Sequence, residues 1–137
     1  MDKLYNLFEQ VILESVSRDK VIDCIENKYR VNITYAGTND TATEKRHIEV
    51  YAYGTTESGY PVIRAFQLFG DTKTIKPAWK FFRLDRILSW TPTNFKFHNP
   101  VSDRDSTIPK YKEDGSDDTM KFRPIMTAKF DNKNRKK

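Results

Sequence analysis

The sequence contains a single cysteine, Cys24, among its 137 residues. One thiol cannot form an internal disulfide, which predicts a protein of a reducing compartment. No apolar run approaches the roughly 20 residues that a membrane-spanning helix needs. The N-terminal stretch MDKLYNLFEQ lacks the continuous apolar core of a signal peptide. These absences predict an intracellular protein with no membrane partner.

Motifs of catalysis and of metal binding are also lacking. His47 and His98 are the only 2 histidines, and their spacing from each other and from Cys24 suggests no metal site. The sequence has no P-loop, no G-x-G-x-x-G and no G-x-S-x-G. The acidic run YKEDGSDD lacks the terminal glutamate of a calcium loop and is typical of a solvated turn. The sequence therefore predicts a protein that is not an enzyme and has no cofactor.

What the chain does have is a mild excess of positive charge. Its 24 lysines and arginines exceed its 19 acidic residues, for a formal net charge of +5. Such an excess is compatible with anionic partners without demonstrating them. The length is that of one domain with a modest core.

Residues 1–28 are predicted to form two short helices. Apolar residues recur at helical spacing from Leu4 to Val11, and Ser17 is a predicted N-cap with Asp19 in the first turn behind it. Neither helix has the basic, reaching face of a DNA-recognition helix. We expect the pair to cover one face or end of a sheet.

Residues 29–97 are predicted to form about five short antiparallel strands. Apolar and polar residues alternate in the first segments, and GTTESG is typical of a turn between antiparallel neighbours. Alternation breaks near Asp85 and Arg86, which predicts a β-bulge there. The pattern predicts an α+β fold that is mainly β, a small antiparallel barrel or rolled sheet. The expected strands are 29–35, 47–53, 60–70, 78–90 and 93–97, with Pro92 separating the last two.

Residues 98–137 differ in character and are predicted to form a polar, irregular C-terminal extension. Six acids and three bases give the part from 98 to 120 a net charge of −3. Apolar residues return in KFRPIMTAKF, which predicts either an edge segment or a docking segment for a partner. The terminal DNKNRKK is a basic tail.

Basic and aromatic residues are interleaved in KPAWKFFRLDRILSW and its neighbouring strands. Guanidinium groups bind phosphates and aromatic faces stack on bases, so a surface with both is suited to unpaired nucleic acid. The candidate cations are Arg46, Arg64, Lys80, Arg83 and Arg86, and the candidate stacking surfaces are Tyr35, Tyr51, Tyr53, Phe66, Trp79 and Phe81.

Each candidate also has a structural interpretation. Arg64 lies on a mostly apolar strand face and needs a partner, either an internal carboxylate such as Glu49 or an external anion. Asp85 can pair with a neighbouring arginine and cancel part of the charge. For Arg46 the favoured interpretation is a solvated charge at a strand end. Tyr51 and Tyr53 are at least as typical of cross-strand packing as of ligand stacking.

The motif KFFRLDRI, with ITYAG and VIRAFQ before it, resembles the WYL domain family over Val31–Phe97. The resemblance is strongest to the short stand-alone WYL-like proteins of bacteriophages and their hosts. The family's naming triplet is replaced by Pro61, Val62 and Ile63, and Lys80 replaces the first arginine of the closing motif, so the bidentate geometry of an arginine is lost there. The resemblance implies a small Sm-like β-barrel that binds anionic ligands through a basic pocket.

Together these features predict a non-enzymatic binding module for single-stranded nucleic acid or a nucleotide. The alternative is a phage-encoded structural or protein-interaction protein that docks through its barrel and tail, as a homo-oligomer or on another partner. The expected location is the cytoplasm, that of the host cell or the virion if a phage encodes the chain.

Overall fold

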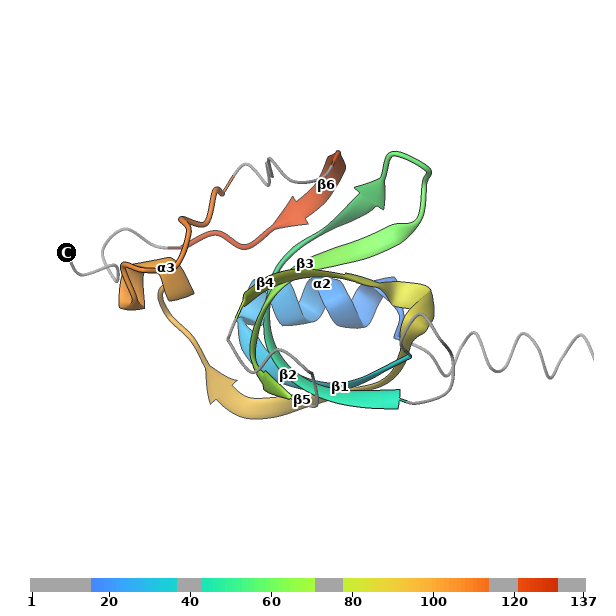
Figure 1. Ribbon diagram of the computed structural model, residues 1–137, viewed down its shortest axis with the longest axis horizontal. Helices are drawn as coiled ribbons and strands as arrows, with labels where there is room; N and C mark the ends of the chain where they lie inside the picture. The colour runs from blue at the N-terminus through green and yellow to red at the C-terminus, as the bar shows by residue number, and fades with distance from the viewer. Residues whose placement is uncertain (1–15, 37–42, 71–77, 114–120, 131–137) are drawn as a thin grey trace, which may run out of the picture.

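The computed structural model describes residues 16–36, 43–70, 78–113 and 121–130 (Figure 1). The described chain is mainly β and builds one antiparallel sheet of 6 strands in the order β4-β3-β2-β1-β5, with β6 paired to β2. The strands are β1 (Tyr29–Ala36), β2 (Thr43–Thr56), β3 (Pro61–Gly70), β4 (Ala78–Arg83), β5 (Ile87–Lys96) and β6 (Phe122–Thr127).

Helix α2 (Arg18–Asn27) precedes the sheet, as predicted. The Ser17 side chain accepts a hydrogen bond from the Lys20 backbone N–H at 3.3 Å, and Asp19 lies in the positive first turn. The first predicted helix lies outside the described residues. No helix in the described ranges is long and apolar enough to cross a membrane.

The predicted fourth strand is shorter than expected. Strand β4 ends at Arg83, and the 3₁₀ turn η1 (Leu84–Arg86) takes the place of the predicted bulge. Strand β5 then runs from Ile87 to Lys96 through Pro92, so the predicted strand boundary at Pro92 is wrong. Proline is tolerated there because β5 is an edge strand that pairs with β1 alone in the described part of the chain.

The sheet curls strongly, so that β1 to β5 surround a common interior with α2 against them (Figure 1). Its two end strands, β4 and β5, follow each other in the chain through η1. Within the described residues they pair with β3 and β1 and not with each other, so hydrogen bonds do not close the sheet. A rolled antiparallel sheet is thus confirmed, and closure into a barrel is not.

The core fills the inside of the curl and continues under the C-terminal segment. Helix α2 buries Val21, Cys24 and Ile25 against the sheet. On the sheet, the fully buried positions include Val31, Ile33, Ile48, Val50, Ile63, Phe82 and Ile87.

The described part of the C-terminal extension contains two regular elements, where the sequence predicted an irregular extension. It forms the short helix α3 (Val101–Arg104) and strand β6, and it buries Val101 and Phe130. Strand β6 passes so close to Gly54 of β2 that a Cβ atom there would lie 2.1 Å from the carbonyl oxygen of Arg123. The predicted edge segment is thus part of the sheet.

Candidate anion-binding site

The predicted cations do not gather in one place. Arg83 is held by Asp85, which accepts hydrogen bonds from its Nε at 3.0 Å and its Nη2 at 2.6 Å. Those bonds raise the pKa of the guanidinium, whose face covers the ring of Tyr60 at 3.8 Å. Arg83 is therefore paired with a neighbouring carboxylate at the surface, as the sequence had suggested for Asp85.

Arg46 is not a solvated strand-end charge. Its side chain is only 10% exposed, and it forms an ion pair with Glu44. Its Nη1 also donates to Oε1 of the buried Gln67 at 2.7 Å. The carboxylate and the amide oxygen thus engage the two terminal nitrogens, while the buried Nε has no hydrogen-bond partner among the described residues.

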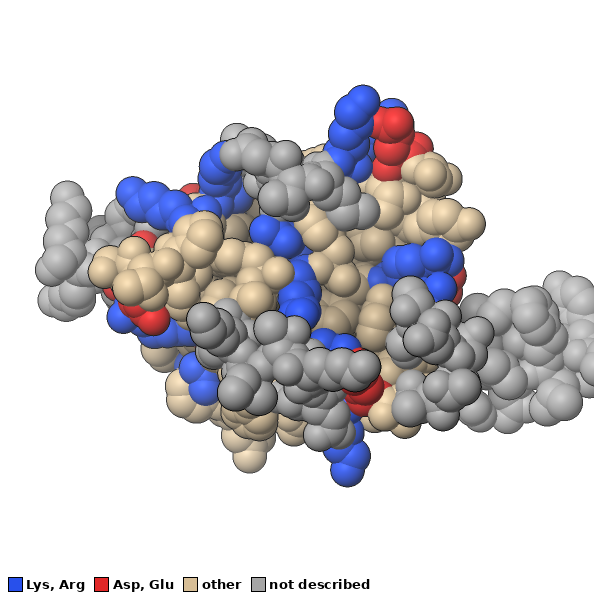
Figure 2. Space-filling model, in the orientation of Figure 1, with Lys and Arg blue, Asp and Glu red and all other residues tan. Residues whose placement is uncertain are grey.

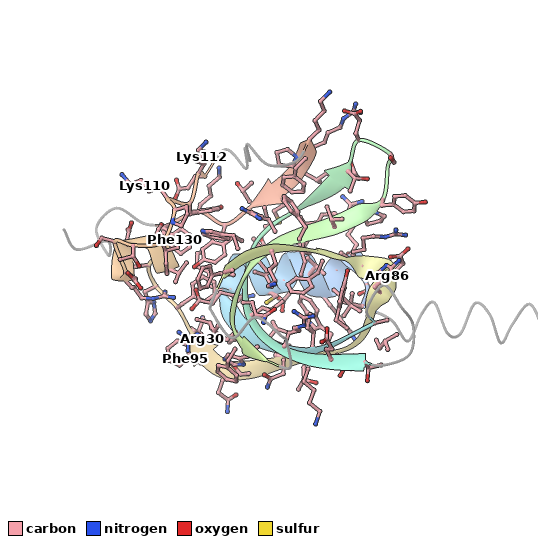
Figure 3. The ribbon with its side chains drawn as sticks, in the orientation of Figure 1. Arg30, Arg86, Phe95, Lys110, Lys112 and Phe130 are labelled. Atoms are coloured by element: carbon pink, nitrogen blue, oxygen red, sulfur yellow. The ribbon has the colours of Figure 1, made fainter. Side chains whose placement is uncertain are left out.

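Arg86 and Lys80 are the two remaining candidate cations of the β4–η1 segment. Arg86 is at the side of the molecule opposite Arg30 and Phe95 (Figure 3). Lys80 is half-buried in β4, and by alternation its side chain leaves the sheet on the face opposite to Trp79 and Phe81. The blue lysine and arginine groups of Figure 2 are accordingly spread over the viewed face.

The two candidate tyrosines of β2 are core residues. Tyr51 is 0% exposed and Tyr53 is 6% exposed, so neither presents a ring face to a ligand. The Tyr51 ring lies 4.8 Å from both the Trp79 and the Tyr111 rings, measured between centroids. Burial and the neighbouring Glu49 raise the pKa of the Tyr51 hydroxyl. Tyr51 anchors the C-terminal segment to the sheet.

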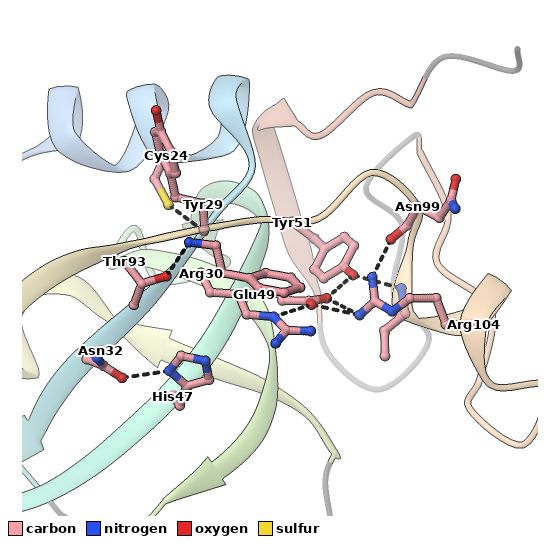
Figure 4. Close-up of polar contacts among 12 residues, drawn as sticks. Cys24, Tyr29, Arg30, Asn32, His47, Glu49, Tyr51, Thr93, Asn99 and Arg104 are labelled. Atoms are coloured by element: carbon pink, nitrogen blue, oxygen red, sulfur yellow. Dashed lines mark hydrogen bonds and ion pairs between the residues drawn. The ribbon is translucent and has the colours of Figure 1, made fainter. Parts of the chain in front are cut away.

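Glu49 is the centre of a buried charge network (Figure 4). Its carboxylate is 0% exposed and accepts hydrogen bonds from Arg104 Nη2 at 2.7 Å and from Arg30 Nε at 2.9 Å. The Tyr51 hydroxyl donates to it at 2.6 Å and accepts from the Val101 N–H at 2.8 Å. A buried carboxylate needs such partners. The network joins β1, β2 and α3.

Three arginines do converge, around a cavity of about 750 Å³ that we call the arginine cleft. Arg30 comes from β1, Arg64 from β3 and Arg104 from α3, three separate segments. The cleft is lined by Arg30, Arg64, Phe66, Leu68, Ala78, Trp79, Val101, Arg104, Asp105, Thr107, Ile108 and Pro109. Of the predicted site residues, it contains Arg64, Phe66 and Trp79.

Two of the three arginines lie against aromatic rings, and of these rings Trp79 lines the cleft. The Arg64 guanidinium carbon lies 5.2 Å from the Trp79 ring and 4.6 Å from the Phe81 ring, and the same atom of Arg30 lies 3.8 Å from the Phe95 ring. The Trp79 indole N–H donates to the Pro109 carbonyl at 2.9 Å, which fixes the ring against the extension.

The described residues give the arginine cleft an excess of positive charge. Three guanidinium groups lie with two carboxylates, the buried Glu49 behind the wall and Asp105 at the lining, which leaves a formal charge of +1 among these residues. Thr107 donates two hydrogen bonds to Asp105 and thereby lowers the pKa of that carboxyl group. The arrangement can bind an anion that carries an apolar or aromatic part.

Sequence reasoning missed Arg30 and Arg104. Arg30 looked like the polar member of an alternating strand, and Arg104 lay in a segment with a net negative charge. The available signal was Glu49, a carboxylate in an apolar strand, which required cationic partners. Glu49 was considered only as one of two possible partners of Arg64, the other being an external anion, and its ion pairs in the structure are with Arg30 and Arg104.

No group of three or more histidine, cysteine or acidic side chains within the described ranges could hold a metal ion. Comparison of the chain with known protein families, curated proteins and solved structures found no match.

Proposed function

We propose that the protein is a non-enzymatic module that binds single-stranded nucleic acid or a nucleotide in the arginine cleft. The convergence of Arg30, Arg64 and Arg104 from three segments on one aromatic-walled cavity carries this proposal. In this role the guanidinium groups bind phosphate and the half-buried Trp79 offers part of its ring to a base.

The size of the cleft supports a ligand of this class. Small-molecule sites commonly measure about 300–1,000 Å³ and are mostly apolar with a few placed polar groups. The arginine cleft, at about 750 Å³, has Phe66, Leu68 and Ile108 on its walls and its charges from arginine. Arginine suits phosphate because its planar fork donates two parallel hydrogen bonds.

We propose further that the chain is a WYL-like, Sm-like barrel. The strand order β4-β3-β2-β1-β5, with the end strands joined by η1, supports a rolled sheet of that kind. The KFFRLDRI motif forms most of β4 and the η1 turn. The cleft is lined by Ala78 and Trp79, which precede the motif in β4.

The test is binding of a fluorescent ten-nucleotide single strand of thymidylate, followed by anisotropy in a series of salt concentrations. We expect Arg64→Met to weaken binding by about tenfold, since an arginine–phosphate contact is worth about 1–3 kcal/mol. We also expect the slope of log K against log salt to fall by about 0.7 for the lost contact. Arg86→Met, which changes the same charge on the opposite side of the molecule, is the matched control and should bind as the wild type does.

A second candidate function is that of a protein-interaction module. Strand β5 pairs with β1 alone in the described part of the chain, and on it Leu88 and Phe95 are 50% and 51% exposed. An open strand edge with apolar side chains is a site for strand addition by a partner. A stable oligomer in solution with no affinity for single strands or nucleotides would favour this candidate over the first.

A further inference from the structure

A second basic cavity lies at another place in the fold. Three lysines line it: Lys28 at the end of α2, Lys96 at the end of β5 and Lys129 after β6. We call this cavity of about 280 Å³ the lysine pocket. Its other lining residues are Glu26, Asn27, Phe97, His98 and Phe130, none of which lines the arginine cleft.

The contacts of the three ammonium groups are with rings and carbonyl oxygens. Lys28 Nζ lies 5.3 Å from the centre of the Phe130 ring, and Lys96 Nζ lies 5.2 Å from that of the Tyr29 ring. Lys129 Nζ donates to the Glu113 backbone carbonyl at 2.9 Å. Among the described residues, no ion pair joins any of the three ammonium groups to a carboxylate.

The like charges act on one another. Burial lowers the pKa of Lys28, and the charge of Lys96 lowers it further, against an opposing effect of Glu113. Among the described residues, three ammonium groups lie with the carboxylates of Glu26, which lines the pocket, and Glu113 nearby, which leaves a formal charge of +1. An anion between the lysines would relieve this repulsion.

The backbone at Lys28 adds an independent observation. Lys28 is the C-cap of α2 with φ 59° and ψ 44°, and it is the one non-glycine residue with positive φ in the described ranges. Glycine or asparagine is the usual residue in this left-handed position. A strained position occupied by an unsuited residue is typical of a functional constraint on the side chain. Here that side chain brings an ammonium group over the Phe130 ring at the pocket.

We propose that the lysine pocket binds a phosphate group with two negative charges. Three donors from three segments can surround such a group, and neither the pocket nor its lysines belong to the arginine cleft. The group is either free inorganic phosphate or the terminal phosphate of a nucleotide or a single strand, which present the same doubly charged oxygens.

The first test is calorimetric titration of the full chain with inorganic phosphate. We expect saturable one-site binding, weakened at least about tenfold by Lys28→Asn and by Lys96→Met, because each removes one charged donor. Lys20→Met, which removes an exposed lysine on α2, is the matched control and should leave the affinity unchanged. Equal phosphate affinity in the wild type and the three lysine variants, or no saturable binding, would overturn the proposal. A loss of phosphate affinity in Arg64→Met but in none of the lysine variants would overturn it as well.

The melting temperature of Lys28→Asn distinguishes phosphate binding by Lys28 from a purely structural role of this residue. Asparagine tolerates the left-handed conformation, so Lys28→Asn should melt at a temperature no lower than the wild type while losing phosphate. A lower melting temperature together with unchanged phosphate affinity would show that Lys28 serves the fold alone and would refute the proposal.

The second test compares single strands that end in a 5′-phosphate or a 5′-hydroxyl. If the pocket takes a terminal phosphate, the phosphorylated strand binds about tenfold more tightly, and Lys96→Met removes the difference. If it takes inorganic phosphate alone, both strands bind equally and the calorimetric result still holds. If the wild-type protein binds inorganic phosphate but no single strand, the proposed function of the arginine cleft is contradicted and the lysine pocket is still supported.

Discussion

Glu49→Gln should change stability and anion affinity in opposite directions. The substitution keeps the shape of the side chain but removes the charge that Arg30 and Arg104 share. It also places an amide N–H₂ among donors, because the carboxylate oxygens accept from both arginines and from the Tyr51 hydroxyl. The variant thus loses contacts in the network that joins α3 to the sheet.

The magnitude follows from the burial of the partners. Breaking a fully buried pair costs about 3–5 kcal/mol. Here Glu49 is 0% exposed, but Arg30 and Arg104 are 22% and 32% exposed and can turn toward water. We therefore expect a loss of about 2–4 kcal/mol in the free energy of unfolding, a large share of the roughly 5–15 kcal/mol typical of a domain.

Urea denaturation followed by tryptophan fluorescence measures this loss. The control is Glu57→Gln, whose partner Lys121 is 84% exposed, and it should cost under about 1 kcal/mol. In conditions where Glu49→Gln is folded, it should bind the thymidylate strand more tightly than the wild type, since two guanidinium groups have lost their internal counter-charge. Unchanged stability would refute the network, and weaker strand binding by the folded variant would refute the role of those arginines.

Two further predictions concern the packing of the sheet. Gly54→Ala should lower the free energy of unfolding by about 1–3 kcal/mol, because its Cβ would lie 2.1 Å from the Arg123 carbonyl oxygen and would push β6 from β2. The control is Gly59→Ala, which has no atom within 4 Å of the added Cβ but has φ +93°, so it measures backbone strain without crowding. A Gly54→Ala protein as stable as the wild type would contradict the close approach of β6 to β2. Burial raises the pKa of Cys24 to about 12, so native protein should resist alkylation at pH 8 and react once unfolded. As the pH rises, the thiol ionises first in the unfolded chain, so its contribution to stability should be full below about pH 8.5 and decline toward about pH 12. Rapid alkylation of the folded protein at pH 8 would contradict the burial of the thiol.

The local elements could be predicted because neighbouring residues decide them. Ser17 caps α2 through the N–H of Lys20, three positions along the chain, and the alternation of β1 needs only its own residues. The error at Pro92 arose because proline blocks a central strand but not an edge strand, and the place of β5 in the sheet depends on the whole fold.

The site could be predicted only in part, because some of its residues are brought together only by the whole fold. Arg64, Phe66 and Trp79 share one sheet face, which alternation and the β3–β4 pairing both require. Arg104 reaches Glu49 across 55 residues of sequence, and the polar segment that carries it folds back through aromatic contacts with Tyr51. The polar composition of that segment predicted that it is solvated. Its few apolar residues, such as Val101, are buried by contacts that only the folded chain provides.

The most direct test of the central claim is the salt dependence of single-strand binding in wild type, Arg64→Met, Arg104→Met and Arg86→Met. The arginine cleft predicts weaker binding and a smaller salt slope in the first two variants, with Arg86→Met equal to the wild type. Equal binding by all four proteins, or a loss confined to Arg86→Met, would contradict it.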